Sequence, residues 1–263
     1  MSELVNESAA IIANENVGPR LHVLTLDSPK IARCIQPGQF VHVKVPGRNE
    51  NILRRPFSVY SRDEGKGTID ILYQEVGALT EHLPTLKTGS MEVMGPLGNS
   101  WNGKCSRALL VGGGVGAAPL FMLAERLSQE GTPFDVVLGA QTEKALVARR
   151  RYEELRGCTV SCSTDDGTFG RAGFCTSLVE ERLEGGHSSS GEPYDFLAVC
   201  GPEPLMRIVA RMGCEAGVFT QVSLEKRMAC GIGACLSCVV ETVQGKKRSC
   251  VDGPVFNAEE VVW

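Results

Sequence analysis

Hydrophobic and polar residues alternate in short runs between positions 9 and 94. β-Branched residues are frequent in these runs, and turn signals such as Pro37-Gly38 and Pro46-Gly47 separate them. Evenly spaced short strands with turns between them are typical of a small antiparallel barrel. We therefore predict strands at residues 9–13, 21–26, 40–45, 57–61, 68–73 and 91–94, and a short helix at 78–86.

The hydrophobic period changes after position 107. An apolar run at residues 108–111 predicts a buried strand, and glycines occupy most of 112–116. Leu120, Leu123 and Leu127 follow at helical spacing and mark the apolar face of a helix. Strands and helices alternate further on, which is typical of a parallel sheet covered by helices. The predicted strands are 134–138, 159–163 and 196–200, the helices are 144–155, 174–183 and 204–214, and 185–191 is expected to be an exposed loop.

These two patterns predict a multidomain β plus α/β protein. The predicted domains are residues 1–102, an antiparallel β-barrel, residues 103–218, a doubly wound parallel sheet, and residues 219–263, a small cysteine-containing domain. With 263 residues, of which 43% are hydrophobic, the chain can form a core in each of the two larger domains.

Charge and hydropathy exclude several classes of function. The formal net charge is −4 and no basic block occurs in the sequence, so a nucleic-acid partner is not expected. No apolar run is long enough to cross a bilayer. The first residues lack the basic and apolar segments of a secretion signal, so we expect a soluble cytoplasmic protein.

Four cysteines near the C-terminus have the spacing of an iron–sulfur site. Cys230, Cys235, Cys238 and Cys250 follow the pattern C-x4-C-x2-C-x11-C, whose first three positions match plant-type ferredoxins. Four thiolates can hold a [2Fe-2S] cluster, which transfers one electron at a time. The residues between them are mostly small, so backbone N–H groups can approach the cluster sulfurs. We therefore predict a [2Fe-2S] centre with these four metal ligands.

Disulfides and a structural zinc ion are the alternatives for these cysteines. Disulfides suit small secreted chains, whereas this chain has eleven cysteines, an odd number, and no secretion signal. Structural zinc sites usually combine two closely spaced cysteine pairs, and only Cys235 and Cys238 have that spacing. A zinc-stabilised, non-enzymatic binding module stays open as an alternative at this point.

The glycine-rich segment after the first parallel strand is suited to a dinucleotide. Glycine lets the backbone approach a pyrophosphate, and a helix N-terminus offers free N–H groups. Ala117 replaces the last glycine of the G-x-G-x-x-G fingerprint, so a merely tight turn is the alternative. The next strand ends without an acidic residue for a ribose, and no basic cluster follows Ala140 directly. The choice between NAD and NADP therefore stays open, with NAD favoured.

Several separate motifs resemble those of the ferredoxin-NADP reductase superfamily. They are Arg55-Pro56-Phe57-Ser58, Gly95-Pro96-Leu97-Gly98, the glycines between Gly112 and Gly116, and Cys200-Gly201-Pro202. Within this superfamily, the four-cysteine segment, with Val251-Asp252-Gly253-Pro254 after its last cysteine, resembles the family of electron-transfer subunits of NAD-dependent, type B dihydroorotate dehydrogenases. This similarity extends over essentially the full length of the chain.

The resemblance implies an FAD site on the barrel. In the family, the strand with Arg55, Pro56, Phe57 and Ser58 holds FAD; Arg55 neutralises a cofactor phosphate and Ser58 lies beside the flavin N5. Relatives usually carry G-x-G-T where this chain has Gly77-Ala78-Leu79-Thr80, so the close backbone approach at Leu79 departs from the family pattern. The other FAD contacts that the resemblance implies are Leu72, Tyr73 and Gln74 at the flavin and its ribityl chain, and Leu79 and Thr80 at the pyrophosphate.

The resemblance also implies a nicotinamide dinucleotide site on the parallel sheet. Gly113, Gly114 and Gly116 would border the dinucleotide, and Asp166 would lie near its adenosine half. Cys200, Gly201 and Pro202 would line the nicotinamide face. Hydride transfer to a flavin needs no covalent enzyme intermediate, so Cys200 is not expected to be a nucleophile and no residue is assigned as catalytic. The four histidines are assigned no role.

By the same resemblance, NADH reduces FAD, and the electrons pass singly through the cluster out of the subunit. The chain lacks a recognisable barrel of eight β/α units for the pyrimidine chemistry. The resemblance therefore implies an FMN-containing catalytic subunit as partner, docked at or beside the cysteine segment, in a heterotetramer of two plus two. The small subunit of an electron-bifurcating ferredoxin-NADP reductase or of a sulfide dehydrogenase is the alternative within this class.

Overall fold

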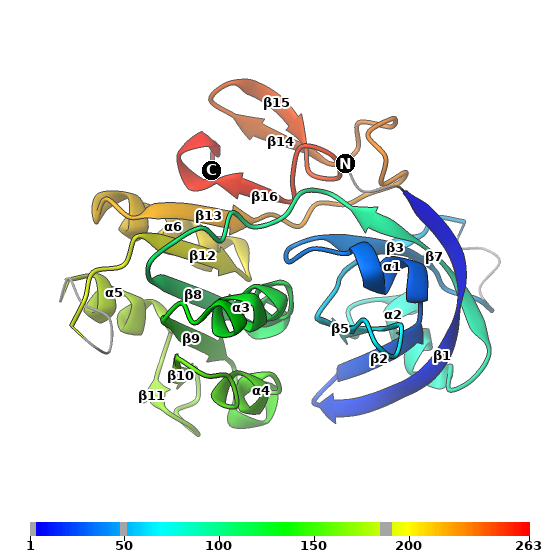
Figure 1. Ribbon diagram of the computed structural model, residues 1–263, viewed down its shortest axis with the longest axis horizontal. Helices are drawn as coiled ribbons and strands as arrows, with labels where there is room; N and C mark the ends of the chain where they lie inside the picture. The colour runs from blue at the N-terminus through cyan, green and yellow to red at the C-terminus, as the bar shows by residue number, and fades with distance from the viewer. Residues whose placement is uncertain (1–3, 48–51, 185–190) are drawn as a thin grey trace.

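The computed structural model describes residues 4–47, 52–184 and 191–263. Its described part comprises an N-terminal antiparallel sheet, a central parallel sheet flanked by helices, and a small C-terminal region (Figure 1). The N-terminal and central parts lie side by side, and the C-terminal hairpin lies beyond the upper edge of the central sheet in this view (Figure 1). Residues 185–190, including His187, lie outside the described residues, so the loop predicted there stays a prediction.

The N-terminal sheet has seven antiparallel strands within the described residues, in the order β4-β3-β7-β1-β2-β6-β5. Each predicted strand is present, although the one predicted at 57–61 is divided in two. Alternate residues face the interior, where Val41 and Val43 pack with Leu24 and Ile71. The strands are β1 (Val5–Gly18), β2 (Leu21–Asp27), β3 (Phe40–Lys44), β4 (Arg55–Ser58), β5 (Ser61–Asp63), β6 (Thr68–Gln74) and β7 (Ser90–Leu97).

The divided strand closes this sheet into a barrel. β4 pairs with β3 at one edge of the sheet, whereas β5 pairs with β6 at the other. Between them, the Val59 N–H donates to the Gln39 carbonyl at 3.3 Å and the Tyr60 N–H donates to the Asp70 carbonyl at 2.8 Å. One continuous segment therefore joins the two edges, and the predicted barrel is confirmed.

Two short helices accompany the barrel. The helix α2 (Ala78–His82) and the 3-10 turn Leu83–Thr85 occupy the segment predicted as one helix. The helix α1 (Pro29–Cys34) is not predicted, because six residues are too few to show a helical period. It buries Ile31 and Ala32, and the Arg62 guanidinium donates to the carbonyls of Ala32 at 3.2 Å and Ile35 at 2.8 Å. Tertiary contacts thus stabilise α1.

The central sheet is doubly wound, as predicted. Its order within the described residues is β11-β10-β9-β8-β12-β13-β16, and all neighbours are parallel except β13 and β16. The chain runs outward from β8 to β10 and then returns to place β12 on the other side of β8. The strands are β8 (Ala108–Gly113), β9 (Phe134–Ala140), β10 (Cys158–Thr164), β11 (Arg171–Ala172), β12 (Phe196–Cys200), β13 (Phe219–Ser223) and β16 (Val255–Asn257).

The helices of this domain follow the predictions with one clear exception. The segment predicted as a helix at 144–155 forms only the 3-10 turn Glu143–Ala145 and the short helix α4 (Arg149–Glu153). Val147 lies between these two elements and packs against Gly18 of the barrel. A Cβ on Gly18 would lie only 2.7 Å from Val147 Cγ1. This contact between domains interrupts the helix. The other helices are α3 (Ala118–Glu130), α5 (Thr176–Glu184) and α6 (Glu203–Glu215).

The C-terminal region is attached to the edge of the central sheet. β13 pairs with β12 and β16 pairs with β13, so strands at both ends of this region extend that sheet. β14 (Val239–Thr242) and β15 (Gly245–Arg248) form a separate hairpin, and the four predicted cluster cysteines lie between β13 and β16. The domain division at 102/103 and 218/219 stays a prediction. The segment that carries the cysteines is thus held at both ends.

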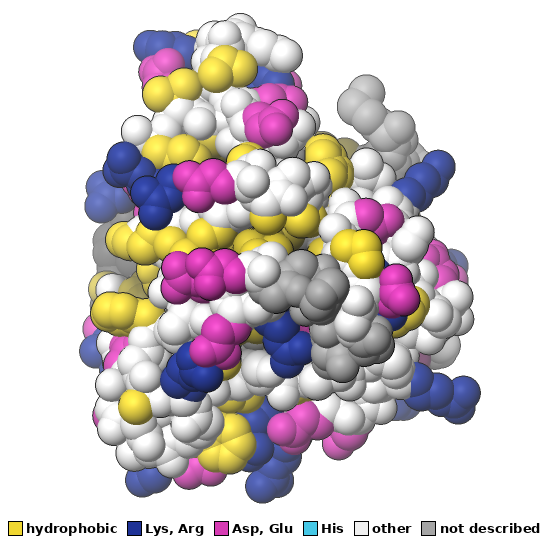
Figure 2. All heavy atoms as spheres, turned by 90° about the vertical axis from the view of Figure 1, so that its left-hand side faces the viewer, with side chains coloured by type: hydrophobic (Ala, Val, Ile, Leu, Met, Phe, Trp, Pro, Cys, Tyr) yellow, Lys and Arg dark blue, Asp and Glu magenta, His cyan; other side chains and the backbone are white. Residues whose placement is uncertain are grey.

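Membrane-spanning helices and surface charge are the structural features that bear on the excluded classes. Among the described residues, no helix is both long and apolar enough to span a membrane. Figure 2 shows basic and acidic side chains interspersed over the described part of one face, without an extended field of one sign. A nucleic-acid surface would carry clustered basic residues.

Candidate functional site

The predicted dinucleotide residues meet where the strand order of the central sheet reverses. β8 ends at Gly113 and β12 ends at Cys200, and these neighbouring strands pair Gly112 with Cys200. In open α/β sheets, ligands bind beyond the carboxyl ends of strands at such a reversal. The turns that follow β8 and β12 therefore lie together at the position where this type of sheet binds nucleotides.

Two of the predicted glycines are needed for the contact between these turns. A Cβ on Gly116 would lie 2.6 Å from the Cys200 carbonyl oxygen, and a Cβ on Gly113 would lie 2.9 Å from Pro202 Cδ. Both distances are too short for a real side chain. Gly114 differs, because its φ is 56° and a Cβ there would have no neighbour within 4 Å. The tight-turn interpretation thus explains Gly113 and Gly116, while Gly114 leaves backbone open to a ligand.

Cys200 is buried and has no feature of a nucleophile. Its thiol donates to the Ser223 carbonyl at 3.7 Å, and burial raises its pKa well above the usual range. A thiol in this environment stays protonated and unreactive. This agrees with the expectation that Cys200 is a wall of the site.

Asp166 lies just beyond the carboxyl end of β10, at the same edge of the sheet. The Thr168 hydroxyl donates to its carboxylate at 2.7 Å and the Thr168 N–H donates at 3.0 Å. These hydrogen bonds lower the pKa of Asp166. The side chain is therefore an ordered, ionised carboxylate, which is a suitable acceptor for ribose hydroxyls.

All four residues of the predicted FAD strand belong to β4, and all are half-buried. Arg55 Nη1 donates to the Leu53 carbonyl at 2.9 Å and to the Arg54 carbonyl at 3.3 Å. Within the described residues the Arg55 guanidinium forms no ion pair with a carboxylate. A guanidinium held in this way can bind a phosphate. Pro56 and Ser58 lie opposite His42 and Phe40 of β3.

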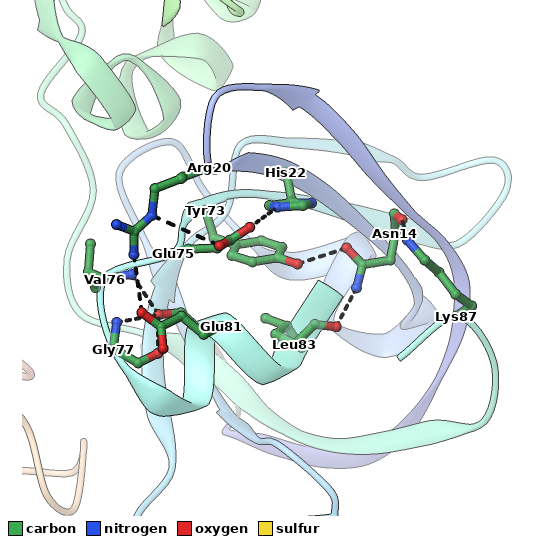
Figure 3. A network of polar contacts seen from close by, with 11 residues as sticks. Asn14, Arg20, His22, Tyr73, Glu75, Val76, Gly77, Glu81, Leu83 and Lys87 are labelled. Carbon is green, nitrogen blue, oxygen red and sulfur yellow. Dashed lines mark hydrogen bonds and ion pairs between the residues drawn. The ribbon is translucent and has the colours of Figure 1, made fainter. Parts of the chain in front are cut away.

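Tyr73 does not present its ring to a bound flavin. The ring is buried in the barrel core, stacked on His22 at 5.2 Å between ring centroids and edge-on to Phe57 at 6.1 Å. Its hydroxyl donates to Asn14 Oδ1 at 2.9 Å, and Asn14 Nδ2 donates to the Leu83 carbonyl at 2.8 Å (Figure 3). A flavin contact at position 73 would therefore use the backbone. Of its predicted neighbours, Leu72 is buried towards the central domain and Gln74 is exposed.

Replacing Tyr73 by phenylalanine is expected to destabilise the barrel by about 0.5–1.5 kcal/mol, because the hydrogen bond to Asn14 is lost. The flavin content should stay at the wild-type value, since the hydroxyl points into the core. Denaturant unfolding and the flavin absorbance measure the two effects. A large loss of flavin without loss of stability would contradict the position of the ring.

Leu79 and Thr80 belong to the first turn of α2. The Leu79 side chain is buried in the barrel core. Thr80 Oγ1 accepts hydrogen bonds from the N–H groups of Val76 at 2.9 Å and Gly77 at 3.1 Å (Figure 3). Both side chains therefore stabilise the turn, and any phosphate contact by this segment would come from its backbone.

The first three cluster cysteines lie on a sharply bent loop. Gly231 has a φ of 73°, Gly233 of 81° and Leu236 of 59°, a left-handed value that is uncommon for leucine. This path brings the Cys235 N–H to 3.4 Å from Cys230 Sγ, where it donates a hydrogen bond. Backbone N–H groups directed at cysteine sulfur are a feature of iron–sulfur loops.

The cysteines make contacts in two pairs. Cys230 accepts the hydrogen bond from Cys235, and the Cys238 and Cys250 thiols interact with each other. As they stand, no three His, Cys, Asp or Glu side chains of the described residues surround a single ion. A di-iron cluster takes two thiolates on each iron, whereas structural zinc takes four ligands around one ion. The kind of metal centre that the four cysteines hold stays a prediction.

The two pairs differ in environment. Cys235 is exposed, and hydrogen bonding to Ser237 lowers the pKa of its thiol to about 6. Cys250 is buried, and burial raises the pKa of its thiol to about 12. A metal that binds there must displace the proton. All eleven cysteines are described and free, so the disulfide alternative receives no support.

Polar contacts order the cysteine segment internally and join it to the barrel. Arg248 Nη1 donates to the Gly233 carbonyl at 3.2 Å, and Arg248 Nε pairs with Asp252 at 3.1 Å. Asn99, at the end of the barrel, donates through Nδ2 to the Val255 carbonyl at 2.8 Å and accepts from the Val255 N–H at 3.0 Å. The barrel and the cysteine loops are therefore held in one relative position.

Strand β3 lies between the predicted FAD strand and the cysteine loop. Its outward residue Phe40 packs in one cluster with Leu97, Cys238 and Cys250, and it lies opposite Ser58 of β4. The next outward residue, His42, faces Gly231, where a Cβ would lie 2.8 Å from His42 Nδ1. Burial and the nearby Arg54 and Arg55 charges lower the pKa of His42 to about 4. The predicted flavin and cluster sites are thus neighbours across one strand.

Comparison with protein families assigns the same three parts. Residues 8–101 match the oxidoreductase FAD-binding domain, and residues 110–211 match the oxidoreductase NAD-binding domain. Residues 225–262 match the iron-sulfur cluster binding domain of dihydroorotate dehydrogenase B. The fold and the site therefore define an FAD- and NAD-binding oxidoreductase with an iron–sulfur domain.

Similar proteins narrow this class to one family. The chain is 38% identical to the dihydroorotate dehydrogenase B (NAD(+)) electron transfer subunit of Bacillus caldolyticus over 97% of this chain and 98% of that one. It is 36% identical to the corresponding subunit of Desulforamulus reducens over 97% of both chains. The chain belongs to the family of electron transfer subunits of NAD-dependent dihydroorotate dehydrogenase B.

Solved structures share the fold of this chain. A structure of the NADH-dependent reduced ferredoxin-NADP oxidoreductase, an enzyme of flavin-based electron bifurcation, superposes with a TM-score of 0.86 and 30% identity over 97% of this chain and 90% of that one. A ferredoxin NADP+ reductase from Neisseria gonorrhoeae with bound FAD and NADP has a TM-score of 0.67 and 13% identity over 83% of this chain and 99% of that one. The latter likeness shows the fold alone.

Proposed function

We propose that this subunit passes electrons between NAD(H), FAD and a [2Fe-2S] cluster, and onward to the FMN of a catalytic dihydroorotate dehydrogenase subunit. When bound, FAD accepts a hydride and can release its two electrons singly, and the cluster carries one electron at a time. The observation that carries the proposal is the position of β3, whose outward side chains contact the cluster cysteines while its edge pairs with the FAD strand.

The residues of the barrel hold the flavin in this proposal. Arg55 would neutralise a phosphate of the cofactor, and Ser58 would lie at the flavin, with Pro56 and Phe57 on the same strand. Residues 72–74, 79 and 80 contribute through Leu72, Gln74 and the backbone, because the side chains of Tyr73, Leu79 and Thr80 are engaged within the barrel.

The turns beyond β8 and β12 position the nicotinamide dinucleotide. The backbone at Gly114 is open to the pyrophosphate, and Asp166 accepts hydrogen bonds from the adenosine ribose. Cys200, Gly201 and Pro202 would line the nicotinamide face, with Cys200 buried behind the two turns. No side chain has to move a proton, because the reaction proposed for the site is a hydride transfer.

The cysteines of this chain support a [2Fe-2S] cluster in this proposal. Cys230, Cys235, Cys238 and Cys250 have plant-type spacing and make contacts in two pairs, which fits two thiolates on each of two irons. Phe40 and the buried Cys238 and Cys250 screen the inner side of this site from water. The exposed Cys235 marks the side from which an electron can leave the subunit.

The partner surface lies around the cysteine loops. Ile232, Leu236 and Val251 are 51%, 62% and 40% exposed, so three large apolar side chains border the proposed cluster. We propose that the FMN-containing subunit covers them, in a cytoplasmic heterotetramer of two plus two. Docking here would exclude water and shorten the path from cluster to FMN.

Replacing Leu236 by aspartate is expected to weaken the complex with the catalytic subunit by about 1.5–3 kcal/mol, the range for burying a leucine. Aspartate tolerates the left-handed backbone at this position, so the loop should keep its shape. Analytical ultracentrifugation of the mixed subunits measures the Kd. Val243→Asp, an equally exposed apolar position in the hairpin turn, is the control and should leave the Kd unchanged. Equal weakening by both variants would contradict the docking surface.

The decisive experiment compares reductants and metals on the anaerobically purified protein. We expect bound FAD, two irons per chain, and a paramagnetic resonance of a reduced [2Fe-2S] cluster after addition of NADH. Co-purification from native cells should yield an FMN-containing companion. Protein with one zinc, no iron and no flavin would overturn the proposal.

A second candidate is the small subunit of an electron-bifurcating ferredoxin-NADP reductase. The TM-score of 0.86 with the structure of such an enzyme favours it. The companion subunit that co-purifies with the chain separates the two candidates, because both can take NADH. An FMN-containing dihydroorotate dehydrogenase would support the first candidate, and the large subunit of a ferredoxin-NADP reductase would support the second.

A further inference from the structure

His42 is a fully buried polar side chain whose ring nitrogens make no hydrogen bond of normal geometry within the described residues, although the Cys230 backbone lies within reach of the ring. An imidazole always carries at least one N–H donor. Leaving a buried donor unsatisfied costs free energy, so such a side chain indicates a group that binds beside it.

The period of β3 directs this side chain out of the barrel. Val41 and Val43 pack in the barrel core, whereas Phe40 and His42 alternate with them and face the cysteine segment. His42 lies opposite Pro56 of the FAD strand and Met94 of β7. A polar residue at this position is not required by the barrel, because its neighbours on this face are apolar.

The cysteine loop covers the ring directly. A Cβ on Gly231 would lie 2.8 Å from His42 Nδ1 and 3.3 Å from Cε1, so only glycine can occupy that position. Gly231 follows Cys230, the first predicted ligand, and the Cys230 backbone makes a contact with the imidazole that falls short of a hydrogen bond of normal geometry. The ring is therefore adjacent to the place that the cluster would occupy.

We propose that His42 donates an N–H hydrogen bond to the iron–sulfur cluster at its Cys230 side and thereby raises the reduction potential of the cluster. The inference rests on the proposed function and adds to it a residue that positions and tunes the cluster. Reduction adds negative charge to the cluster, and a donor aimed at its sulfurs stabilises that charge. His42 thus makes the cluster a better acceptor of electrons from the neighbouring flavin.

The test is a redox titration of the full-length protein with the variants His42→Leu and His42→Gln, followed by paramagnetic resonance. Leucine keeps apolar volume and removes the donor, whereas glutamine keeps an N–H donor. At a fixed solution potential, we expect the leucine variant to show a roughly tenfold smaller ratio of reduced to oxidised cluster, about 59 mV for a one-electron couple. The glutamine variant should lie close to the wild type.

The proposal would be overturned if the cluster potential were unchanged in both His42 variants. It would also be overturned if both variants shifted the potential equally, because the effect would then come from packing and not from the N–H donor. His82→Gln is the matched control, because His82 lies on α2 and contacts the Pro46 carbonyl, away from the cysteines. Its potential should equal that of the wild type.

A second measurement is made on the wild-type protein, so it does not depend on whether a His42 variant retains its cluster. The wild-type protein is produced in cells supplied with ¹⁵N-labelled histidine and is then reduced. Its pulsed paramagnetic resonance should show a weak coupling between a histidine nitrogen and the cluster. Its absence would overturn the proposal even if His42→Leu loses iron. A wild-type protein without any iron–sulfur cluster would instead refute the proposed function, so the two failures are distinguishable.

Discussion

Cys235→Ser is expected to lose the iron–sulfur cluster completely while NADH still bleaches the flavin. Cys235 is one of the four proposed ligands, and its thiol is held as a thiolate near neutral pH by hydrogen bonding to Ser237. A serine hydroxyl is a hard ligand and a poor substitute for thiolate at iron–sulfur sites. The FAD and NAD residues lie in other parts of the chain, so reduction of the flavin should be unaffected. Iron content, cluster resonance and flavin absorbance measure these effects.

Cys214→Ser is the matched control for this experiment. Cys214 is half-buried on α6, outside the cysteine segment, and should keep the iron content of the wild type. The rate of electron transfer to the catalytic subunit gives the sharper outcome, because the Cys235→Ser variant should no longer reduce that subunit. Undiminished delivery of electrons to that subunit would contradict the path through the cluster.

Arg55→Ala is expected to weaken FAD binding by about 1–3 kcal/mol, the cost of leaving a charged hydrogen-bonding group unpaired. This corresponds to an increase in Kd of about 5-fold to 150-fold. The Arg55 guanidinium is held by two backbone carbonyls and pairs with no carboxylate of the described residues, so its charge is available to a cofactor phosphate. Flavin absorbance after dialysis measures the retained FAD.

Arg54→Ala is the control for charge and position. Arg54 Nη2 pairs with Glu92 at 2.8 Å. In this proposal Arg54 does not bind FAD. The Arg54→Ala variant should retain FAD as the wild type does. Wild-type FAD content in Arg55→Ala would refute the assignment of Arg55 to the cofactor phosphate.

The elements with a strong local signal could be predicted from the sequence. The alternation of β3 and β6 and the helical spacing of α3 each place hydrophobic residues on one face, because burial requires it. The short helix α1 could not be predicted, since contacts with Arg62 stabilise it, and α4 is shorter than predicted because Val147 packs on the barrel.

The site shows the same division. The glycine-rich turn after β8 is visible in the sequence, but the different tasks of Gly113, Gly114 and Gly116 appear only when the turn after β12 is beside them. The burial of the Tyr73 ring depends on contacts with Asn14 and His22, which are far from Tyr73 in the sequence. His42 was assigned no role from the sequence. His42 lies between two core valines of β3, so its side chain faces the other side of that strand, and this pattern is the signal that could have identified it.

The sequence by itself determined the spacing of the four proposed cysteine ligands, the family motifs and the order of the domains, because each depends on residues that are close together in the chain. Only the tertiary structure decided how the parts cooperate. It closed the barrel through β4 and β5, anchored the cysteine segment at the edge of the central sheet, and placed Phe40 and His42 between the FAD strand and the cluster cysteines. These contacts join residues far apart in the sequence, and packing rather than local spacing determines them.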